Sequence, residues 1–377
     1  MAISTGRVPI APALVADHLD RLATALDQAD ADGLLVFRNT NILAFCGVPL
    51  GPSDRLVCGL INRQGQVGLI LPGFEASAAH GLPPGGRSFT WEEHQDPYAV
   101  TADAAASLGI AEGRLLLDGR TWIGAQERLR RRLPKARLEL DTGLIESVRI
   151  CKSTEEIAAI DKSCSDIGSI YRRIPRLLQE GLSELDLSRE LSRCMAAEGL
   201  TNVGHLIQGG PSASVPHGRP GRRRFRDGDA VIIDLVCRRE GYHGDMTRCF
   251  ALGRVPDEVK QVYSIVREAQ QAAIESVHAG AVCEEVDRAA RSVIETAGLG
   301  DYFSHRLGHG IGLDVHEPPF LVQGNRQALA PGMCVTIEPG VYIPGRFGIR
   351  IEDVVAVTDD GCELLSDGAA TDVSEFG

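Results

Sequence analysis

The sequence predicts an α/β protein built from two domains. Its 377 residues exceed the roughly 100–200 residues of one typical domain. Up to about residue 150, short apolar runs alternate with amphipathic helical stretches, which is typical of a small α/β unit. Beyond that point long helical patterns come first and apolar strand-like runs follow. We therefore expect one domain over residues 1–150 and a second over residues 151–377.

The first domain begins with a helical pattern over residues 12–30, whose apolar side is formed by Leu14, Leu19, Leu22 and Leu26. Gly33 ends this helix, and the run Leu34–Phe37 that follows is expected to be a buried strand. Further strand-like runs lie at residues 56–61, 67–71 and 115–117. Helical stretches between them lie at residues 101–108 and 125–133.

The second domain begins at a capping box, Ser153-Thr154-Glu155-Glu156, in which the serine oxygen and a glutamate carboxylate accept hydrogen bonds from free backbone N–H groups. It opens a long helix whose apolar positions continue to Leu177. More helices are predicted over residues 185–198, 257–278 and 283–297. After residue 228 strand-like runs dominate, at residues 230–237, 334–337 and 349–357.

The composition argues against several classes of protein. Lys and Arg number 39 and Asp and Glu 51, so the net charge is −12, which disfavours a general binder of nucleic acids or anionic membranes. Apolar stretches such as Val231–Cys237 are far shorter than the ~20 residues of a membrane span. Residues 1–10 contain no apolar run, so no signal peptide is expected. The ten cysteines include no C-x-x-C pair, and we expect free thiols in a cytoplasmic protein.

Two aspartates form the first candidate site. The apolar run Val231–Ile233 ends in Asp234, and Asp245 follows after the turn-prone segment 239–241. Two antiparallel strands joined there would place both acids side by side on one face. Close carboxylates repel each other unless a metal ion lies between them. The alternative is an ordinary aspartate at a strand end and another in a turn.

One histidine and two glutamates form further candidates. The glycines of Gly308-His309-Gly310 would let the backbone approach closely and leave the imidazole unobstructed. Glu338 and Glu352 each lie within an apolar strand-like run, where a solvated position is the less expected one. Each residue alone also has an ordinary explanation, such as a turn histidine or a glutamate paired with Arg350.

Taken together, these residues point to a metal centre. Four carboxylates and one imidazole would carry a formal charge near −4, which requires about two divalent ions. Mostly oxygen ligands with a single nitrogen favour Mn²⁺, Co²⁺, Fe²⁺ or Zn²⁺. Two-metal sites of this kind activate water and stabilise the oxyanion that develops during acyl transfer.

The order and spacing of these motifs resemble the pita-bread metallopeptidases (family M24), in the branch of the Xaa-Pro dipeptidases (prolidases) and aminopeptidase P. The resemblance is strong over residues 151–377, where it rests on Pro216-His217, Asp234, Gly244-Asp245-Met246-Thr247-Arg248, His309, His316, Glu338 and Arg350-Ile351-Glu352-Asp353. It is looser in the first domain, where Asn41-Ile42-Leu43 and Cys46-Gly47 resemble the creatinase-type N-terminal domain. The resemblance implies a catalytic domain with a strongly curved antiparallel sheet, helices on its outer face and the ligands on its inner face.

The resemblance also implies which residues hold the metal ions. Asp234 would hold one ion through both carboxylate oxygens, and Asp245 and Glu352 would bridge the two ions. His309 and Glu338 would hold the second ion, and Glu338 would also take the proton from the attacking water. Mn²⁺ is the metal that we favour, with Co²⁺, Zn²⁺ and Fe²⁺ as alternatives.

Three further residues have roles by the same resemblance. His217 and His316 would not ligate metal, but would bind the scissile carbonyl and the proline end of the substrate and stabilise the tetrahedral intermediate. Arg350 would orient a bridging carboxylate from outside the ligand set.

The chain also departs from the family pattern. Positions that usually carry Gly, Ser and Thr near the two aspartates carry Val236, Gly244 and Cys249. Archaeal dipeptide-cleaving relatives carry an arginine after the His-Glu segment that can hold the proline carboxylate, and here that place is Phe320. Arg326 or the loop Arg222–Arg224 would then have to replace it.

The expected activity is hydrolysis of the Xaa-Pro bond of dipeptides, because the compact length and the segment His305–His309 resemble short prolidases. Aminopeptidase P activity on longer Xaa-Pro-Xaa peptides is the main alternative. A metal-retaining hydrolase or lyase of the same fold is another, and a non-catalytic binding module is disfavoured because all five ligands are retained. We also expect a homodimer in which residues between about 35 and 100 narrow the neighbouring active site.

Overall fold

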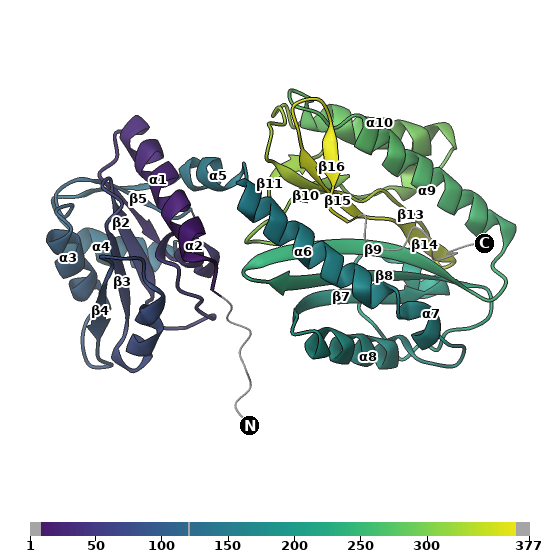
Figure 1. Cartoon of the computed structure of the whole chain (residues 1–377), viewed down its shortest axis with the longest axis horizontal. Coiled ribbons are helices and arrows are strands. Elements are labelled where there is room, and N and C mark those ends of the chain that lie inside the picture. Colours follow the sequence, from purple (N-terminus) through teal and green to yellow (C-terminus); the bar gives the residue numbers. More distant parts are fainter. Residues whose placement is uncertain (1–8, 120, 367–377) are drawn as a thin grey trace. The chain divides into compact units, whose positions relative to one another are not determined.

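The computed structural model describes residues 9–119 and 121–366, and its contacts divide the chain into two units, Met1–Arg149 and Ile150–Gly377 (Figure 1). The expectation that residues 1–10 form no signal peptide falls mostly on residues 1–8, which lie outside the described ranges. Within the described ranges, no helix combines the length and apolar character that a membrane span requires.

The first unit is organised around a mixed sheet made of β1 (Gly33–Val36), β2 (Cys58–Asn62), β3 (Val67–Pro72), β4 (Arg87–Trp91), β5 (Arg114–Leu117) and β6 (Arg137–Leu140). The strand order is β4-β3-β2-β1-β5-β6, and β1 runs antiparallel to β2 but parallel to β5. The edge strands β4 and β6 are largely exposed, so they lack the apolar runs by which the inner strands are recognised in the sequence.

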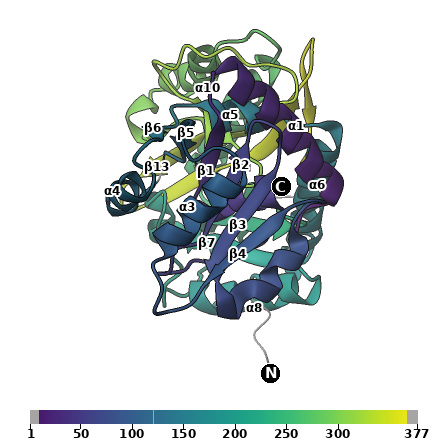
Figure 2. The ribbon, with the colours of Figure 1, turned by 90° about the vertical axis from the view of Figure 1, so that its left-hand side faces the viewer.

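Helices flank this sheet: α1 (Pro12–Gln28), α2 (Asn39–Cys46), α3 (Pro97–Ser107), α4 (Ile123–Arg132), α5 (Leu144–Arg149) and the 3₁₀ helix η1 (Gly73–Gly81). The helices α3 and α4 share one core with the strands, in which Leu60, Ala104 and Leu129 are fully buried. In Figure 2, α3 lies in front of the sheet, over β3.

The second unit contains three hydrogen-bonded sheets. One consists of β7 (Thr201–Gly209), β8 (Asp229–Arg239) and β9 (Tyr242–Leu252). The largest is made, in spatial order, of β11 (Glu317–Leu321), β10 (Gly308–Gly310), β12 (Cys334–Ile337), β15 (Asp353–Val357) and β16 (Cys362–Leu364). The third pairs β13 (Gly340–Ile343) with β14 (Phe347–Arg350). This arrangement, with the helices described next, confirms the predicted α/β class.

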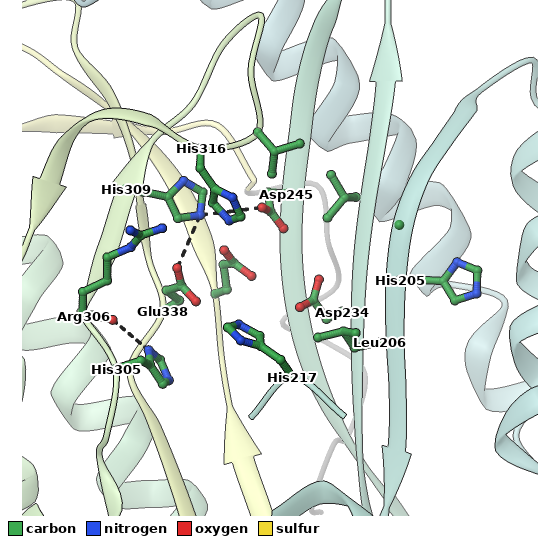
Figure 3. A pocket seen from close by; sticks show the side chains of 14 residues that line it. His205, Leu206, His217, Asp234, Asp245, His305, Arg306, His309, His316 and Glu338 are labelled. Carbon is green, nitrogen blue, oxygen red and sulfur yellow. Dashed lines mark hydrogen bonds and ion pairs between the residues drawn. The ribbon is translucent and has the colours of Figure 1, made fainter. Parts of the chain in front are cut away.

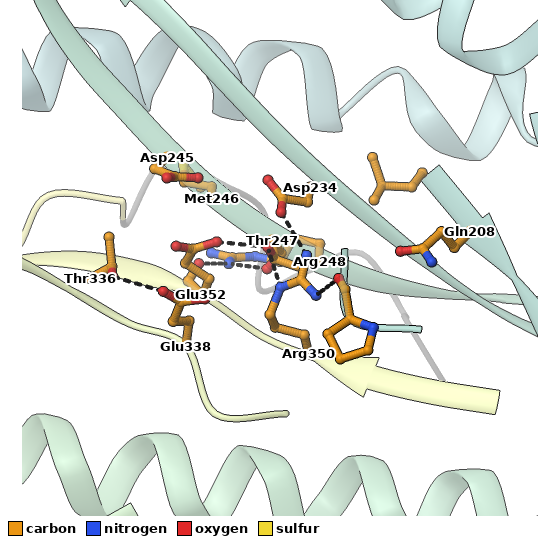
Figure 4. Close-up of polar contacts among 12 residues, drawn as sticks. Gln208, Asp234, Asp245, Met246, Thr247, Arg248, Thr336, Glu338, Arg350 and Glu352 are labelled. Carbon is orange, nitrogen blue, oxygen red and sulfur yellow. Dashed lines mark hydrogen bonds and ion pairs between the residues drawn. The ribbon is translucent and has the colours of Figure 1, made fainter. Parts of the chain in front are cut away.

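Helices cover these sheets: α6 (Thr154–Tyr171), α7 (Ile174–Leu177), α8 (Glu184–Ala197), α9 (Asp257–Glu275), α10 (Cys283–Thr296) and the short η2 (Gly210–Ser214) and η3 (Gly300–Tyr302). On the side of α9 and α10, Val266 and Ala290 are fully buried in one core with Val335 and Val355. The acidic residues lie between the strands, while α6 and α9 pack outside them (Figure 4).

Two predicted elements are interrupted in the structure. The capping box forms as predicted, but the long helix that it opens ends at Tyr171, because the ring of Pro175 would collide with the carbonyl of that residue. The predicted strand 349–357 splits at Glu352, whose backbone N–H donates to Thr247 O at 3.0 Å. This isolated bridge joins two sheets where one continuous curved sheet was expected.

The strand β10 lies so close to its neighbours that it excludes side chains at both of its glycines. A Cβ atom on Gly308 would lie 1.8 Å from Thr336 O, and one on Gly310 would lie 2.2 Å from Pro318 O. The backbone of β10 therefore approaches β11 and β12 closely, as the sequence predicts. Glycine is required at positions 308 and 310 because a side chain there would collide with these strands.

We predict that Gly308→Ala destabilises the second unit by about 2 kcal/mol or more, because the new methyl group must push β10 away from β12. Urea denaturation followed by far-UV circular dichroism measures this loss of stability. The control is Gly361→Ala, whose Cβ would meet its nearest atom only at 4.0 Å. Equal unfolding midpoints for the two variants would contradict the prediction.

Candidate metal centre

The two candidate aspartates lie on one face of the β8–β9 hairpin. The hairpin turns at Glu240 and Gly241, whose φ angles of 51° and 89° suit a two-residue turn. Its register pairs Asp234 with Thr247 and Asp245 with Val236. The acids are thus diagonal neighbours on the same face, which confirms the predicted placement side by side.

The other three candidates reach the same place from different strands. His309 lies on β10, Glu338 directly follows β12, and Glu352 lies in the break between β14 and β15. Their ligand atoms and those of the aspartates form overlapping groups within 4.8 Å, namely Asp234, Asp245 and Glu352, and His309, Glu338 and Glu352. A third such group contains Asp245, His309 and His316. The structure therefore brings all five predicted ligands together, and brings His316 near them as well.

The ring of His309 is oriented as a metal ligand would be. Its Nδ1 lies 3.0 Å from Gly310 O, and since a carbonyl only accepts, Nδ1 carries the proton and Nε2 does not. Burial lowers the pKa of His309 to about 3, so the ring is neutral. The bare Nε2 lies 3.4 Å from Glu338 Oε1 and 3.8 Å from Asp245 Oδ2 (Figure 3). A lone pair facing two carboxylates is repelled unless a cation lies between them.

The carboxylates show the same need for positive charge. Burial, together with neighbouring carboxylates, raises the pKa of Asp245 and of Glu352 well above the usual range. Burial also raises the pKa of Glu338 to about 7, although Arg350 partly offsets it. Asp234 Oδ1 is buried without a hydrogen-bond partner among the described residues. These residues fit a centre that holds divalent cations.

One arginine connects the carboxylates to the surrounding polypeptide (Figure 4). Arg350 Nη2 donates to Asp234 Oδ2 at 2.6 Å, and its Nε donates to Thr247 Oγ1 at 3.2 Å. Thr247 in turn donates to Glu352 Oε2 at 2.7 Å. We expected Arg350 to orient a bridging carboxylate, but it contacts Asp234 directly and reaches Glu352 only through the threonine hydroxyl.

The acids open onto a cavity of about 560 Å³, which is large enough for a small peptide. His217 and His316 line it, and the ring centroids of His316 and His309 lie 4.3 Å apart. Sequence reasoning gave no role to two other residues of the wall, His305 and Arg306, although their proximity to His309 in the chain was a usable signal. His305 Nε2 lies 2.9 Å from the hydroxyl of Tyr342.

The arginines that we expected to replace the missing clamp at Phe320 do not line the cavity. Arg326 is paired with Glu284 at 2.8 Å, and in the loop 222–224 Arg223 forms a bidentate pair with Asp229. Arg326 and Arg223 are therefore engaged in ion pairs, whereas Arg222 and Arg224 of the loop are exposed. Arg306 lines the cavity instead, and its guanidinium carbon lies 4.6 Å from the ring centroid of Phe320.

The raised pKa of Glu338 predicts how pH affects the chelator-treated protein. A carboxylic acid whose folded pKa is raised from 4.5 to about 7 contributes stability below pH 4.5 that is lost as the pH rises through 7. Added Mn²⁺ should reverse this loss, because it binds the ionised ligands. We expect the gain in Tm on adding Mn²⁺ to be larger by several degrees at about pH 8 than at about pH 5.5.

Differential scanning fluorimetry of wild type and Glu338→Gln, each with chelator or Mn²⁺, measures this difference. The variant should show a smaller change between the two pH values, because one titrating ligand is gone. Identical Tm gains of the wild type at both pH values would contradict the prediction.

Comparison with known proteins identifies the family of both units. Residues 158–359 match the model of metallopeptidase family M24, and residues 18–151 match the creatinase/prolidase N-terminal domain. Among curated relatives, the probable dipeptidase PepE of Mycobacterium tuberculosis is 35% identical over 92% of both chains. The Xaa-Pro dipeptidase of Lactobacillus helveticus is 32% identical over 93% of this chain and 96% of its own.

The fold is shared with solved structures of such enzymes. Dipeptidase PepE from Mycobacterium ulcerans superposes with a TM-score of 0.86 at 31% identity, covering 95% of this chain and 96% of its own. Both the sequence and the structure therefore confirm the resemblance stated above. The chain belongs to metallopeptidase family M24 and carries the creatinase/prolidase N-terminal domain.

Proposed function

We propose that this metallopeptidase hydrolyses the Xaa-Pro bond of dipeptides. The observation that carries the proposal is the convergence of four buried or nearly buried carboxylates and the bare Nε2 of His309 at one end of a cavity of peptide size. The names of the curated relatives, a probable dipeptidase and an Xaa-Pro dipeptidase, support the same substrate class. Aminopeptidase P activity on longer peptides is the alternative that the experiments below distinguish.

The proposed ligands of two divalent cations are Asp234, Asp245, His309, Glu338 and Glu352. When bound, the cations would polarise the scissile carbonyl and lower the pKa of the attacking water. We favour Mn²⁺, because the donor set is four carboxylates and one imidazole. Arg350 would hold Asp234 in place from behind.

Glu338 is the proposed proton acceptor for the attacking water. Its carboxyl group lies among the residues that line the cavity, where a carboxylate can accept a proton from a water molecule. Its carboxylate also accepts a hydrogen bond from Thr336 Oγ1 at 3.3 Å, which fixes its orientation. After the bond breaks, the same carboxyl group would return the proton to the leaving proline nitrogen.

His217 and His316 are the proposed substrate contacts on the wall of the cavity. Their ring N–H groups would donate to the scissile carbonyl and hold the proline end, which stabilises the tetrahedral intermediate. A proline nitrogen offers no N–H, so selectivity must come from shape and from groups at the two ends of the substrate.

Arg306 is the residue that we propose to bind the free carboxylate of the proline. Its guanidinium lines the cavity and stacks on Phe320, the residue at the position of the expected clamp. A guanidinium in this place can form a charge-assisted, bidentate pair with a carboxylate. This contact would favour dipeptides over longer peptides, in which that carboxylate is absent.

We retain a cytoplasmic homodimer as part of the proposal, with residues between about 35 and 100 narrowing the neighbouring site. The exposed aromatic side chain of Phe74, 63% accessible within the described residues, supports an interface in that segment.

We predict that Glu338→Gln lowers kcat by at least ~10²-fold, because it removes the proposed base and a ligand. His217→Ala and His316→Ala should lower kcat but keep the metal content of the wild type. Inductively coupled plasma mass spectrometry of the purified variants checks the second statement. A full equivalent of metal lost from His316→Ala would make this histidine a ligand, as the third ligand group allows.

A substrate panel tests the specificity. We predict that wild type with Mn²⁺ cleaves Ala-Pro and Leu-Pro with higher kcat/KM than the matched Xaa-Pro-Xaa tripeptides. Arg306→Ala should raise KM for the dipeptides by ~10–100-fold, because a charge-assisted hydrogen bond is lost, and should change KM for the amidated dipeptides little.

The matched control is Arg326→Ala, which removes an exposed arginine outside the cavity and should leave all constants unchanged. Tripeptides cleaved tenfold better than dipeptides would make the protein an aminopeptidase P. Equal effects of Arg306→Ala on free and amidated dipeptides would remove the proposed role of Arg306.

A further inference from the structure

A buried ion pair lies behind the loop that carries His316. Lys152 Nζ lies 2.7 Å from Glu317 Oε1, and the two side chains are only 1% and 8% exposed. Neither residue lines the cavity, although Glu317 directly follows His316 in the chain. Glu317 is the first residue of β11, and its side chain contacts Lys152 instead of lining the cavity.

The geometry of the loop makes the position of His316 depend on Glu317. Residues 311–316 connect β10 to β11, and the register pairs Gly310 with Glu317 at the base of this loop. His309 and His316 therefore flank the closing pair of the hairpin, which explains why their rings meet edge to face. A shift of Glu317 would move His316 relative to the cluster of carboxylates.

The ion pair also contacts the backbone of the loop 311–316. Glu317 Oε2 accepts from the backbone N–H of Asp314 at 3.3 Å. A Cβ on Gly312 would lie 2.8 Å from Glu317 Oε1 and 3.1 Å from Lys152 Cε, so both side chains pack directly against the loop backbone. Lys152 is itself anchored, because its backbone N–H donates to Gly332 O at 2.8 Å.

Stability alone does not account for an ion pair in this place. Apolar residues of similar volume usually stabilise a core at least as well as a buried ion pair does. The choice of lysine is also notable in a chain with 35 arginines and only 4 lysines. A lysine ammonium is compact, whereas a guanidinium is a wide planar fork, and Lys152 packs closely against Gly312.

We propose that Lys152 and Glu317 are positioning residues, which hold the loop 311–316 so that His316 faces the cavity. The inference rests on the proposed function in that it takes His316 to contact the substrate. A misplacement of about 1 Å in such a group can lower a rate by as much as 10²-fold.

Replacement of the pair by apolar residues, Lys152→Met with Glu317→Leu, tests the proposal in the metal-loaded enzyme. We expect near wild-type metal content and Tm but a ~10–100-fold lower kcat, because the loop loses its fixed position. In a His316→Ala background the same replacement should lower kcat less than threefold. A kcat of the apolar-pair variant within threefold of wild type would overturn the proposal. The same holds if the replacement lowers kcat by the full ~10–100-fold in the His316→Ala background.

Two variants complete the design. Asp166→Leu with Arg239→Met removes a half-buried ion pair outside the cavity and should leave kcat unchanged, which controls for the loss of an ion pair elsewhere in the second unit. Glu317→Gln keeps the volume of the side chain and removes only its charge. Glu317→Gln should lower kcat threefold to tenfold. If the double variant Lys152→Met, Glu317→Leu does not fold, this measurement tests the proposal in its place. No effect of Glu317→Gln would then overturn the proposal.

Hydrogen exchange gives a reading that needs no substrate. Mass spectrometry should show the amides of residues 311–316 exchanging at least tenfold faster in the apolar-pair variant, while the β8–β9 hairpin is unchanged. Unchanged exchange in the loop would overturn the proposal. Wild type that fails to cleave any Xaa-Pro peptide would instead refute the proposed function, and the exchange result would remain interpretable.

Discussion

The buried guanidinium of Arg350 is in direct contact with Asp234, one of the four clustered carboxylates, and it ties together the segments that form the site. It donates to Asp234, to the Thr247 hydroxyl, to Pro216 O at 3.2 Å and to the Tyr342 hydroxyl at 3.0 Å. These partners come from β8, β9, the loop of His217 and β13. One buried side chain therefore connects the β8–β9 hairpin with β13, which belongs to a different sheet.

The charge of this cluster also determines how the second unit can be stable. One arginine cannot neutralise four carboxylates, and burial makes their ionised forms costly. The free energy that cations gain at such a site becomes part of the free energy of folding.

The sequence was sufficient to single out the five residues that the structure brings together, but not the contacts that support them. Asp234, Asp245 and Glu352 were recognisable because acids within apolar strands need compensation. The diagonal register of the two aspartates follows from the two-residue turn of the β8–β9 hairpin, whereas the break at Glu352 depends on pairing with the distant Thr247, which local patterns do not contain. Lys152 and Glu317 are separated by 165 positions, and nothing in either segment indicates the other. The family position of the clamp carries Phe320, and for this reason the prediction from the sequence did not include Arg306.

The contact between Arg350 and Pro216 has a thermodynamic consequence. The same guanidinium touches Asp234, a proposed cation ligand, and the backbone next to His217, a proposed substrate contact. If cations tighten the binding of a peptide by holding this arginine still, linkage requires that the peptide tightens the binding of cations by the same factor. Bound substrate would then strengthen the binding of the metal. An enzyme working at high peptide concentration would keep its metal in surroundings where the substrate-free enzyme would lose it.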